Sequence, residues 1–168
     1  TRPFGNTAAA IAVKQLLKGV PALDAALAGA QAVEDDPTVQ SVGYGGIANS
    51  VGTVSLDACV MDGKTLSCGS VAGVENIRHV AALAKLVMEK TPHVMLVGEG
   101  AKWFALQNGF PLETLLTPES VAEWYKNKPK TLLPKGHDTV TVLALDQKGH
   151  LGGVCTTSGL SYKLHGRV

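Results

Sequence analysis

The stretch Gly136-His137-Asp138-Thr139-Val140 leads into the strand that the sequence predicts over residues 139–146. A connector rich in lysine and proline precedes it, and the composition then changes at once to β-branched residues. β-branched side chains favour extended backbone, whereas proline interrupts regular structure. A hydroxyl residue, Thr139, therefore stands at the head of a strand, directly after an aspartate.

This junction has a chemical interpretation. The hydroxyl of Thr139 can attack the carbonyl of Asp138, and cleavage there would leave Thr139 with a free α-amine beside its own hydroxyl. An α-amine is less basic than a lysine amine, so it can act as the general base for the hydroxyl of the same residue. The alternative is an ordinary turn-to-strand junction that does no more than begin a strand.

The elements around this strand predict a layered α/β protein. Helical periodicity indicates an antiparallel helix pair near the N-terminus, whose alanine and glycine content predicts close packing, and alternating apolar residues indicate two hairpins. Residues 110–135 are expected to be weakly structured, and the sheet to be mainly antiparallel. The predicted helices cover residues 8–17, 22–33, 76–90 and 99–108, and the predicted strands cover 53–60, 65–71, 93–97, 139–146, 151–157 and 161–168.

The composition is that of an ordinary globular protein of one domain. The 168 residues are 45% hydrophobic and 17% charged, with a formal net charge of +1. That balance gives no electrostatic basis for binding nucleic acid or an anionic membrane, and the apolar stretches are too short to span a bilayer. The N-terminus has no signal-peptide architecture, although a processed protein would have lost one.

Cysteine and glycine spacings exclude two kinds of site. Cys59, Cys68 and Cys155 match neither a zinc site nor a redox CxxC pair, and their apolar contexts predict buried thiols. The loop Ser41-Val42-Gly43-Tyr44-Gly45-Gly46 lacks the spacing of a phosphate-binding loop. Its glycines would instead let this backbone approach another element closely or adopt positive φ.

Three strings around the second hairpin resemble the glycosylasparaginase branch of the N-terminal nucleophile hydrolases. They are His137-Asp138-Thr139-Val140, Cys155-Thr156-Thr157-Ser158-Gly159 and Tyr162-Lys163-Leu164-His165-Gly166-Arg167-Val168. Upstream strings resemble bacterial members of the branch and follow the family's order along nearly the whole chain. These lie at residues 22–25, 33–37, 41–46, 56–58 and 89–98.

This resemblance implies a four-layer αββα sandwich, present here as a single, incomplete domain over residues 1–168. It implies a precursor that cuts itself between Asp138 and Thr139, giving an α segment 1–138 and a β segment from residue 139. In the family the new N-terminal threonine attacks the side-chain amide of N4-(β-N-acetylglucosaminyl)-L-asparagine, forms a β-aspartyl ester and releases the glycosylamine, and water then frees aspartate. No metal or organic cofactor is implied, because the nucleophile carries its own base.

Four site residues follow from the resemblance, position by position. Thr139 would be the nucleophile, and Thr157 would hydrogen-bond to it and tune it. Arg167 would form a bidentate pair with the α-carboxylate of the substrate, which suits the planar guanidinium. Ser41 would line the pocket of the nucleophile. Without the resemblance, Thr157 would be interpreted as an ordinary strand threonine, Arg167 as a solvated surface arginine and Ser41 as a loop residue.

Further positions concern self-cleavage and the pocket wall. Asp138 would supply the carbonyl that is attacked, and His137 would assist the geometry of that step. Phe4 matches a phenylalanine of the substrate pocket, but Arg2 stands where the family has a tryptophan. Thr141 stands where members commonly carry glycine, and its side chain would crowd the site.

Two alternatives stay open. Isoaspartyl peptidases with L-asparaginase activity share the fold and the nucleophile, although they tend to carry glycines where His137 and Asp138 stand. The family's sequence continues after Val168 with a Gly-Asp-Ser-Pro segment that holds the substrate amine, and later with a Thr-Gly pair that makes the oxyanion hole. A chain that ends at Val168 would lack both, so an inactive truncated form is the second alternative.

The expected partner is a small glyco-asparagine substrate rather than nucleic acid or a membrane, and we expect a homodimer of the α/β unit. Relatives in this family are exported, to the periplasm in bacteria or to the lysosome in animals. The resemblance therefore implies a compartment of that kind.

Overall fold

The computed structural model describes residues 3–127 and 139–168. Along the chain, these residues form helices α1 (Pro3–Leu16), α2 (Ala22–Glu34), α3 (Val80–Lys90), α4 (Gly98–Gln107) and α5 (Pro118–Asn127), and strands β1 (Ser55–Asp62), β2 (Ser67–Glu75), β3 (Met95–Val97), β4 (Val140–Leu145) and β5 (Leu151–Thr157). The two predicted hairpins and the N-terminal helix pair are confirmed.

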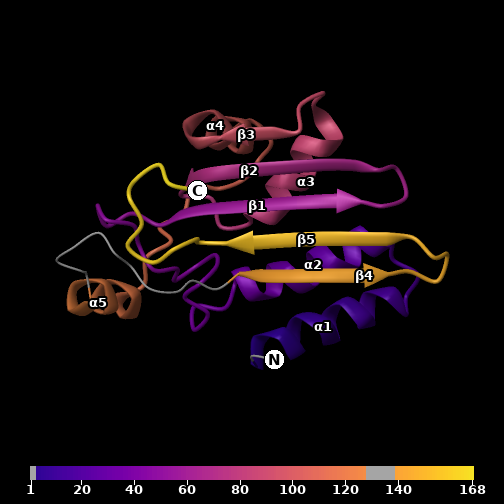
Figure 1. Cartoon of the computed structure of the whole chain (residues 1–168), viewed down its shortest axis with the longest axis horizontal. Coiled ribbons are helices and arrows are strands. Elements are labelled where there is room, and N and C mark those ends of the chain that lie inside the picture. The colour runs from indigo at the N-terminus through magenta and orange to yellow at the C-terminus, as the bar shows by residue number, and fades with distance from the viewer. Residues whose placement is uncertain (1–2, 128–138) are drawn as a thin grey trace.

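One sheet holds these strands in the order β3-β2-β1-β5-β4 (Figure 1). β1 pairs antiparallel with both β2 and β5, and β5 pairs antiparallel with β4. The short β3 runs parallel to β2, and α3 makes the crossover that a parallel pair needs. The prediction of a mainly antiparallel sheet is therefore confirmed.

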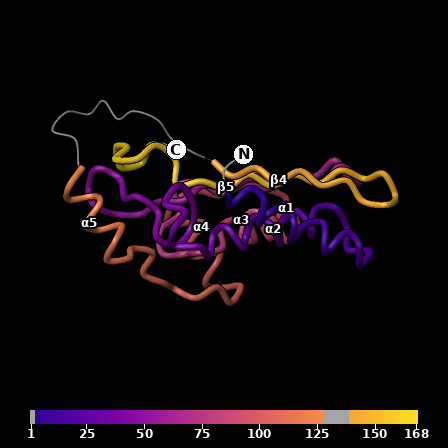
Figure 2. Tube along the Cα trace, turned by 90° about the horizontal axis from the view of Figure 1, so that it is seen from below, coloured from indigo at the N-terminus to yellow at the C-terminus, as the bar shows by residue number. Residues whose placement is uncertain are grey.

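Helices α1, α2 and α3 cover one face of the sheet (Figure 2). β4 shows the sequence basis of this arrangement, because residues 140, 142 and 144 are buried while residues 141, 143 and 145 are exposed. Successive side chains of a strand point to opposite faces of the sheet, so one face of β4 is apolar and packed against helices. The described residues thus form a helical layer and one sheet of the αββα sandwich, and the second face of this sheet is open among them.

Glycines bring the helices close to one another and to the sheet. A Cβ on Gly29 of α2 would lie 2.5 Å from the carbonyl oxygen of Ala8 in α1. A Cβ on Gly152 of β5 would lie 2.3 Å from the backbone nitrogen of Leu23 in α2. Close-packed interiors leave no room to relieve such contacts with rigid backbone. The close packing expected of the helix pair against the layer beneath it is confirmed at Gly152, and the two helices also pack closely on each other.

Residues 118–127 correct the expectation of a weakly structured segment, because they form α5. Thr117 and Ser120 cap this helix reciprocally: the Ser120 N–H donates to Thr117 Oγ1 over 3.1 Å, and the Thr117 N–H donates to Ser120 Oγ over 2.9 Å. Pro118 occupies the first helical position, where its missing N–H costs nothing. The capping pattern is present in the sequence, but the helix is short and mostly polar, so its composition resembles that of a loop.

Residues 161–168 form turns rather than the predicted strand. Tyr162 has a φ of 60° and Gly166 a φ of 87°, and neither value is compatible with an extended strand. The prediction of buried thiols is also wrong, since Cys59 and Cys68 are exposed and Cys155 is half-buried. Their positions on the open face of the sheet explain this exposure.

Among residues 3–127 and 139–168, no helix has both the length and the apolar character that a bilayer span requires.

Adjacent glycines of β5 provide a matched test of the packing between β5 and α2. Gly152→Ala should destabilise the fold by about 1–3 kcal/mol, because its Cβ would meet the backbone of Leu23 at 2.3 Å. Gly153→Ala should change stability far less, since the nearest atom to its Cβ, at 3.1 Å, is Cδ2 of the Leu143 side chain, which can move. Urea unfolding of both variants measures the difference, and equal destabilisation would contradict this account.

Candidate active site

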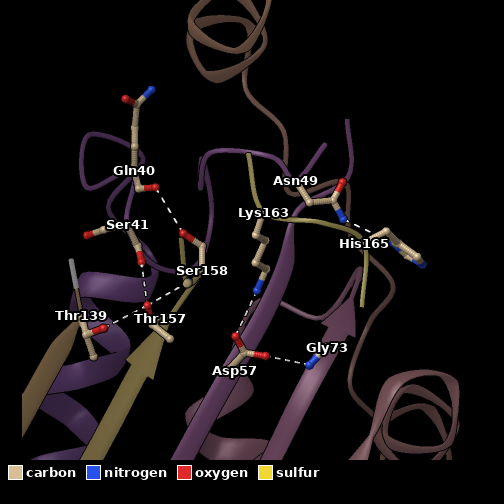
Figure 3. Close-up of polar contacts among 11 residues, drawn as sticks. Gln40, Ser41, Asn49, Asp57, Gly73, Thr139, Thr157, Ser158, Lys163 and His165 are labelled. Atoms are coloured by element: carbon tan, nitrogen blue, oxygen red, sulfur yellow. Dashed lines mark hydrogen bonds and ion pairs between the residues drawn. The ribbon is translucent and has the colours of Figure 1, made fainter. Parts of the chain in front are cut away.

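Two threonine hydroxyls meet at one end of the β4–β5 pair. Thr139 lies immediately before β4, and Thr157 is the last residue of β5. The Thr139 hydroxyl donates to Thr157 Oγ1 over 3.2 Å (Figure 3). The antiparallel register, which pairs Val140 with Thr156, places the ends of the two strands side by side. The predicted pair of nucleophile and tuning threonine is therefore in contact.

The hydrogen bonds of Thr157 fix the direction of its hydroxyl. The Gly159 N–H donates to Thr157 Oγ1 over 2.9 Å, and the Thr157 hydroxyl points to the Ser41 carbonyl at a longer distance of 3.5 Å. Thr157 Oγ1 therefore faces Thr139 as an acceptor. A nucleophile whose hydrogen is held in this way presents its lone pairs elsewhere, which is the orientation that attack on a carbonyl requires.

Ser41 is close to the threonine pair through its main chain. Its carbonyl accepts a hydrogen bond from the Ser158 N–H over 2.7 Å, and this carbonyl, rather than the hydroxyl, is directed at Thr157 (Figure 3). The loop is held against α2, because the Tyr44 N–H donates to the Glu34 carbonyl over 2.8 Å. Gly43 has a φ of 49°, and a Cβ there would lie 2.2 Å from that same carbonyl oxygen. The close approach predicted for this glycine loop is confirmed.

Glu34, which sequence reasoning missed, lies directly behind the site. Its side chain is completely buried, and Glu34 Oε1 accepts hydrogen bonds from the Thr156 hydroxyl at 2.7 Å and from the Ala81 N–H at 3.1 Å. Burial raises the pKa of this carboxyl to about 8, against the opposing effect of the two hydrogen bonds. Glu34 thereby connects the strand that carries Thr157 to the first turn of α3. An acidic residue ending an apolar helix gave no sign of this burial.

A buried ion pair between Asp57 and Lys163, also missed, lies on the other side of Thr157, at 3.1 Å between Oδ2 and Nζ. Lys163 belongs to the last turns of the chain, which also carry Arg167. Arg167 is exposed, and its N–H donates to the Leu164 carbonyl over 3.0 Å. Within the described part of the chain, its guanidinium makes no hydrogen bond or ion pair, so the predicted role of Arg167 in substrate binding stays a prediction.

Phe4 and Thr139 line one groove between α1 and β4. This groove has a volume of about 440 Å³ and is walled by small residues of α1 and by the whole of β4. Phe4 and Thr139 thus share a groove, and the predicted role of Phe4 in substrate binding stays a prediction. His137 and Asp138, assigned to self-cleavage, lie outside the described residues.

Side chains that could hold a metal ion do not gather at this site: the described residues contain no group of three or more His, Cys, Asp or Glu suited to one. Among the described residues, the Thr139 side chain hydrogen-bonds to another hydroxyl, that of Thr157. The arrangement is therefore suited to nucleophilic attack by a hydroxyl, with a neutral partner beside it.

Comparison with known proteins agrees with this geometry. Residues 5–168 match the sequence profile of a protein family described as asparaginase. The chain is 53% identical, over 171 aligned residues, to an N(4)-(Beta-N-acetylglucosaminyl)-L-asparaginase of Elizabethkingia miricola, an alignment covering 98% of this chain and 50% of that protein. The resemblance to glycosylasparaginases is therefore confirmed.

Relatives named for another activity are less similar to this chain. An isoaspartyl peptidase/L-asparaginase of Rattus norvegicus is 40% identical over 161 residues, which cover 91% of this chain and 48% of that protein. One of Homo sapiens is 40% identical over 169 residues, covering 96% of this chain and 54% of that protein. The chain thus spans about half the length of the curated relatives it matches.

The buried Glu34 carboxyl predicts a dependence of stability on pH. Its pKa rises from 4.5 to about 8 on folding, so between these values the folded chain keeps a proton that the unfolded chain releases. Its stabilising contribution is complete below pH 4.5 and is lost as the pH rises through about 8. Glu34→Gln, which cannot titrate, should remove this slope of roughly 1.4 kcal/mol per pH unit. Urea unfolding at a series of pH values tests it, and parallel pH profiles for the two proteins would refute it.

Proposed function

Because the chain belongs to the asparaginase family, we propose that it is the nucleophile-bearing part of an N-terminal threonine amidohydrolase of the glycosylasparaginase type. The proposed substrate is N4-(β-N-acetylglucosaminyl)-L-asparagine, cleaved to aspartate and the glycosylamine. The observation that carries this proposal is the hydrogen bond from the Thr139 hydroxyl to Thr157 Oγ1 at the head of β4. The 53% identity to an enzyme of that name supports the choice of substrate.

Maturation would begin at Thr139. Its hydroxyl oxygen attacks the carbonyl carbon of Asp138, the bond from that carbon to the Thr139 nitrogen breaks, and an ester to Oγ1 replaces the peptide. Water then hydrolyses the ester and leaves Thr139 with a free α-amine and a free hydroxyl. The exposed position of Thr139 at the end of the sheet leaves its hydroxyl open to both reactants.

Turnover would use the same two groups. The α-amine accepts the proton of the Thr139 hydroxyl, Oγ1 attacks the side-chain amide carbon of the substrate, and the glycosylamine leaves with a proton from the amine. The resulting β-aspartyl ester is hydrolysed by water to aspartate and free Thr139. Thr157 contributes by holding the hydroxyl of Thr139, and Arg167 by pairing with the α-carboxylate.

Isoaspartyl peptidase activity is the second candidate, because the relatives at 40% identity carry that name. The higher identity of 53% to the N(4)-(Beta-N-acetylglucosaminyl)-L-asparaginase favours the glycosylated substrate. A homodimer and an exported compartment, both expected from the family resemblance, belong to the same proposal.

Substitution of Thr139 tests maturation and turnover together in the full-length protein. Thr139→Val should give one unbroken species on a denaturing gel and no aspartate release, because valine has no nucleophilic oxygen. Thr139→Ser should still be cut and should still turn over. The wild type should show a mass corresponding to a break between residues 138 and 139. Thr65→Val, an exposed threonine in the β1–β2 turn, is the control and should behave as wild type. An active Thr139→Val protein would end this proposal.

Substrate choice can be tested with the wild type alone. We expect kcat/KM for the glycosylated asparagine to exceed that for a β-aspartyl dipeptide by at least roughly tenfold, which corresponds to about 1.4 kcal/mol of transition-state binding. Initial rates of aspartate release over a range of both substrates measure the ratio. A preference for the dipeptide would assign the chain to the isoaspartyl peptidase group instead.

A further inference from the structure

A buried ion pair that takes no part in the chemistry described above lies next to Thr157. Lys163 Nζ lies 3.1 Å from Asp57 Oδ2, with the two side chains 2% and 10% exposed (Figure 3). Asp57 is also the register partner of Thr157 across the pair of β1 and β5. An unpaired charge at such a place loses its hydration without compensation, so the two groups hold each other in position.

A bulge in β2 fixes the acidic partner. The register between β1 and β2 shifts between Leu56 and Ala58, so two residues of β2 stand opposite Asp57. One of these is Gly73, which has a φ of 61° and donates its N–H to Asp57 Oδ1 over 2.7 Å. Bulges next to functional sites commonly re-aim a side chain. Asp57 is thus held through both carboxylate oxygens, one by the bulge and one by Lys163.

The basic partner belongs to the last segment of the chain, residues 158–168, which we call the C-terminal arm. In this arm the side chains of Ser158 and Lys163 are buried, whereas residues 164–168 are all exposed. The Lys163 carbonyl accepts a hydrogen bond from the Ser50 N–H over 2.7 Å. The preceding Tyr162 has a φ of 60°, which is uncommon for a residue with a side chain, and its N–H donates to the Ala48 carbonyl over 3.1 Å. The arm is therefore pinned at Lys163.

We propose that the ion pair of Asp57 and Lys163 is a positioning device for Arg167, setting where its guanidinium stands relative to Thr139 and Thr157. This inference rests on the proposed function, in which Arg167 binds the α-carboxylate of the substrate. Arg167 follows Lys163 by four residues, and the link between them is held again at His165, whose Nδ1 lies 3.3 Å from Asn49 Nδ2 and 3.6 Å from Glu75 Oε1. A shift at Lys163 would therefore be carried along the arm to Arg167. A shift of the arm would leave two buried charges unpaired, which restricts it to one position.

Positioning and simple stabilisation predict different kinetics. A chain that is merely less stable has fewer active molecules, so kcat falls while KM is unchanged. A misplaced Arg167 weakens binding of the α-carboxylate, so KM rises while the chemistry at Thr139 continues. A glycosyl amide that lacks the α-carboxylate should then be insensitive to loss of the ion pair.

The test compares the full-length wild type with Asp57→Asn/Lys163→Met, in which uncharged side chains of similar volume replace the pair, leave no unpaired charge and keep an acceptor for the Gly73 N–H. We expect KM for the glycosylated asparagine to rise at least tenfold with kcat changed less than threefold, and kcat/KM for the amide without the carboxylate to match the wild type. Lys148→Met, at an exposed lysine of the far hairpin, is the matched control and should leave both substrates unaffected. A fall in kcat at constant KM, or equal losses on both substrates, would overturn the inference.

An amide-exchange measurement separates failure of this inference from failure of the proposed function. The Ser50 N–H, which donates to the Lys163 carbonyl, should exchange at least tenfold faster in the double variant. The Gly63 N–H, which donates to the Leu151 carbonyl at the opposite end of the sheet, should exchange as in the wild type. An inactive wild type would refute the proposed function. Unchanged exchange at Ser50 would show that the pair does not hold the arm, whatever the activity.

Discussion

The antiparallel register of β4 and β5 is the constraint on which the candidate site depends. Val140, Val142 and Ala144 must face the helices, because they form the apolar face of β4. A slip by one residue would turn every side chain of the strand to the opposite face, so burial of these residues fixes the register. With the register fixed, Thr139 and Thr157 meet at the strand ends. The position of Thr139, the proposed nucleophile, is thus a consequence of core packing.

A buried carboxyl and a buried ion pair stand behind the threonine pair. Glu34 holds β5 from the helical side through Thr156, and the ion pair of Asp57 and Lys163 holds the neighbouring strand and the arm. No charged side chain among the described residues forms a hydrogen bond or ion pair with Thr139. Its hydroxyl therefore lacks a side-chain base in this part of the molecule. The α-amine released by cleavage would supply that base within the same residue, which agrees with the proposed chemistry.

Local patterns in the sequence predict the fold better than they predict the site. Alternation in β4 and β5 and the helical periodicity of α2 and α3 are strong, and these elements are found close to their expected limits. The short α5 has the mostly polar composition of a loop, and positive φ at Tyr162 breaks a segment whose composition resembles a strand. Glu34 and Lys163 were missed because their partners, Thr156 and Asp57, lie 122 and 106 residues away in the chain. No local pattern carries that information.

The open face of the sheet has a consequence for specificity. Leu143, Leu145 and Leu151 are 77%, 59% and 60% exposed there, which makes a contiguous apolar surface larger than isolated exposed leucines would give. Thr141 belongs to the same face of β4, one row of side chains from Thr139. Any layer that shields these leucines from water would therefore end beside Thr139 and, under the proposed function, form part of the substrate's surroundings. Substitutions in that layer would then change both the solubility of the protein and its selection of substrate.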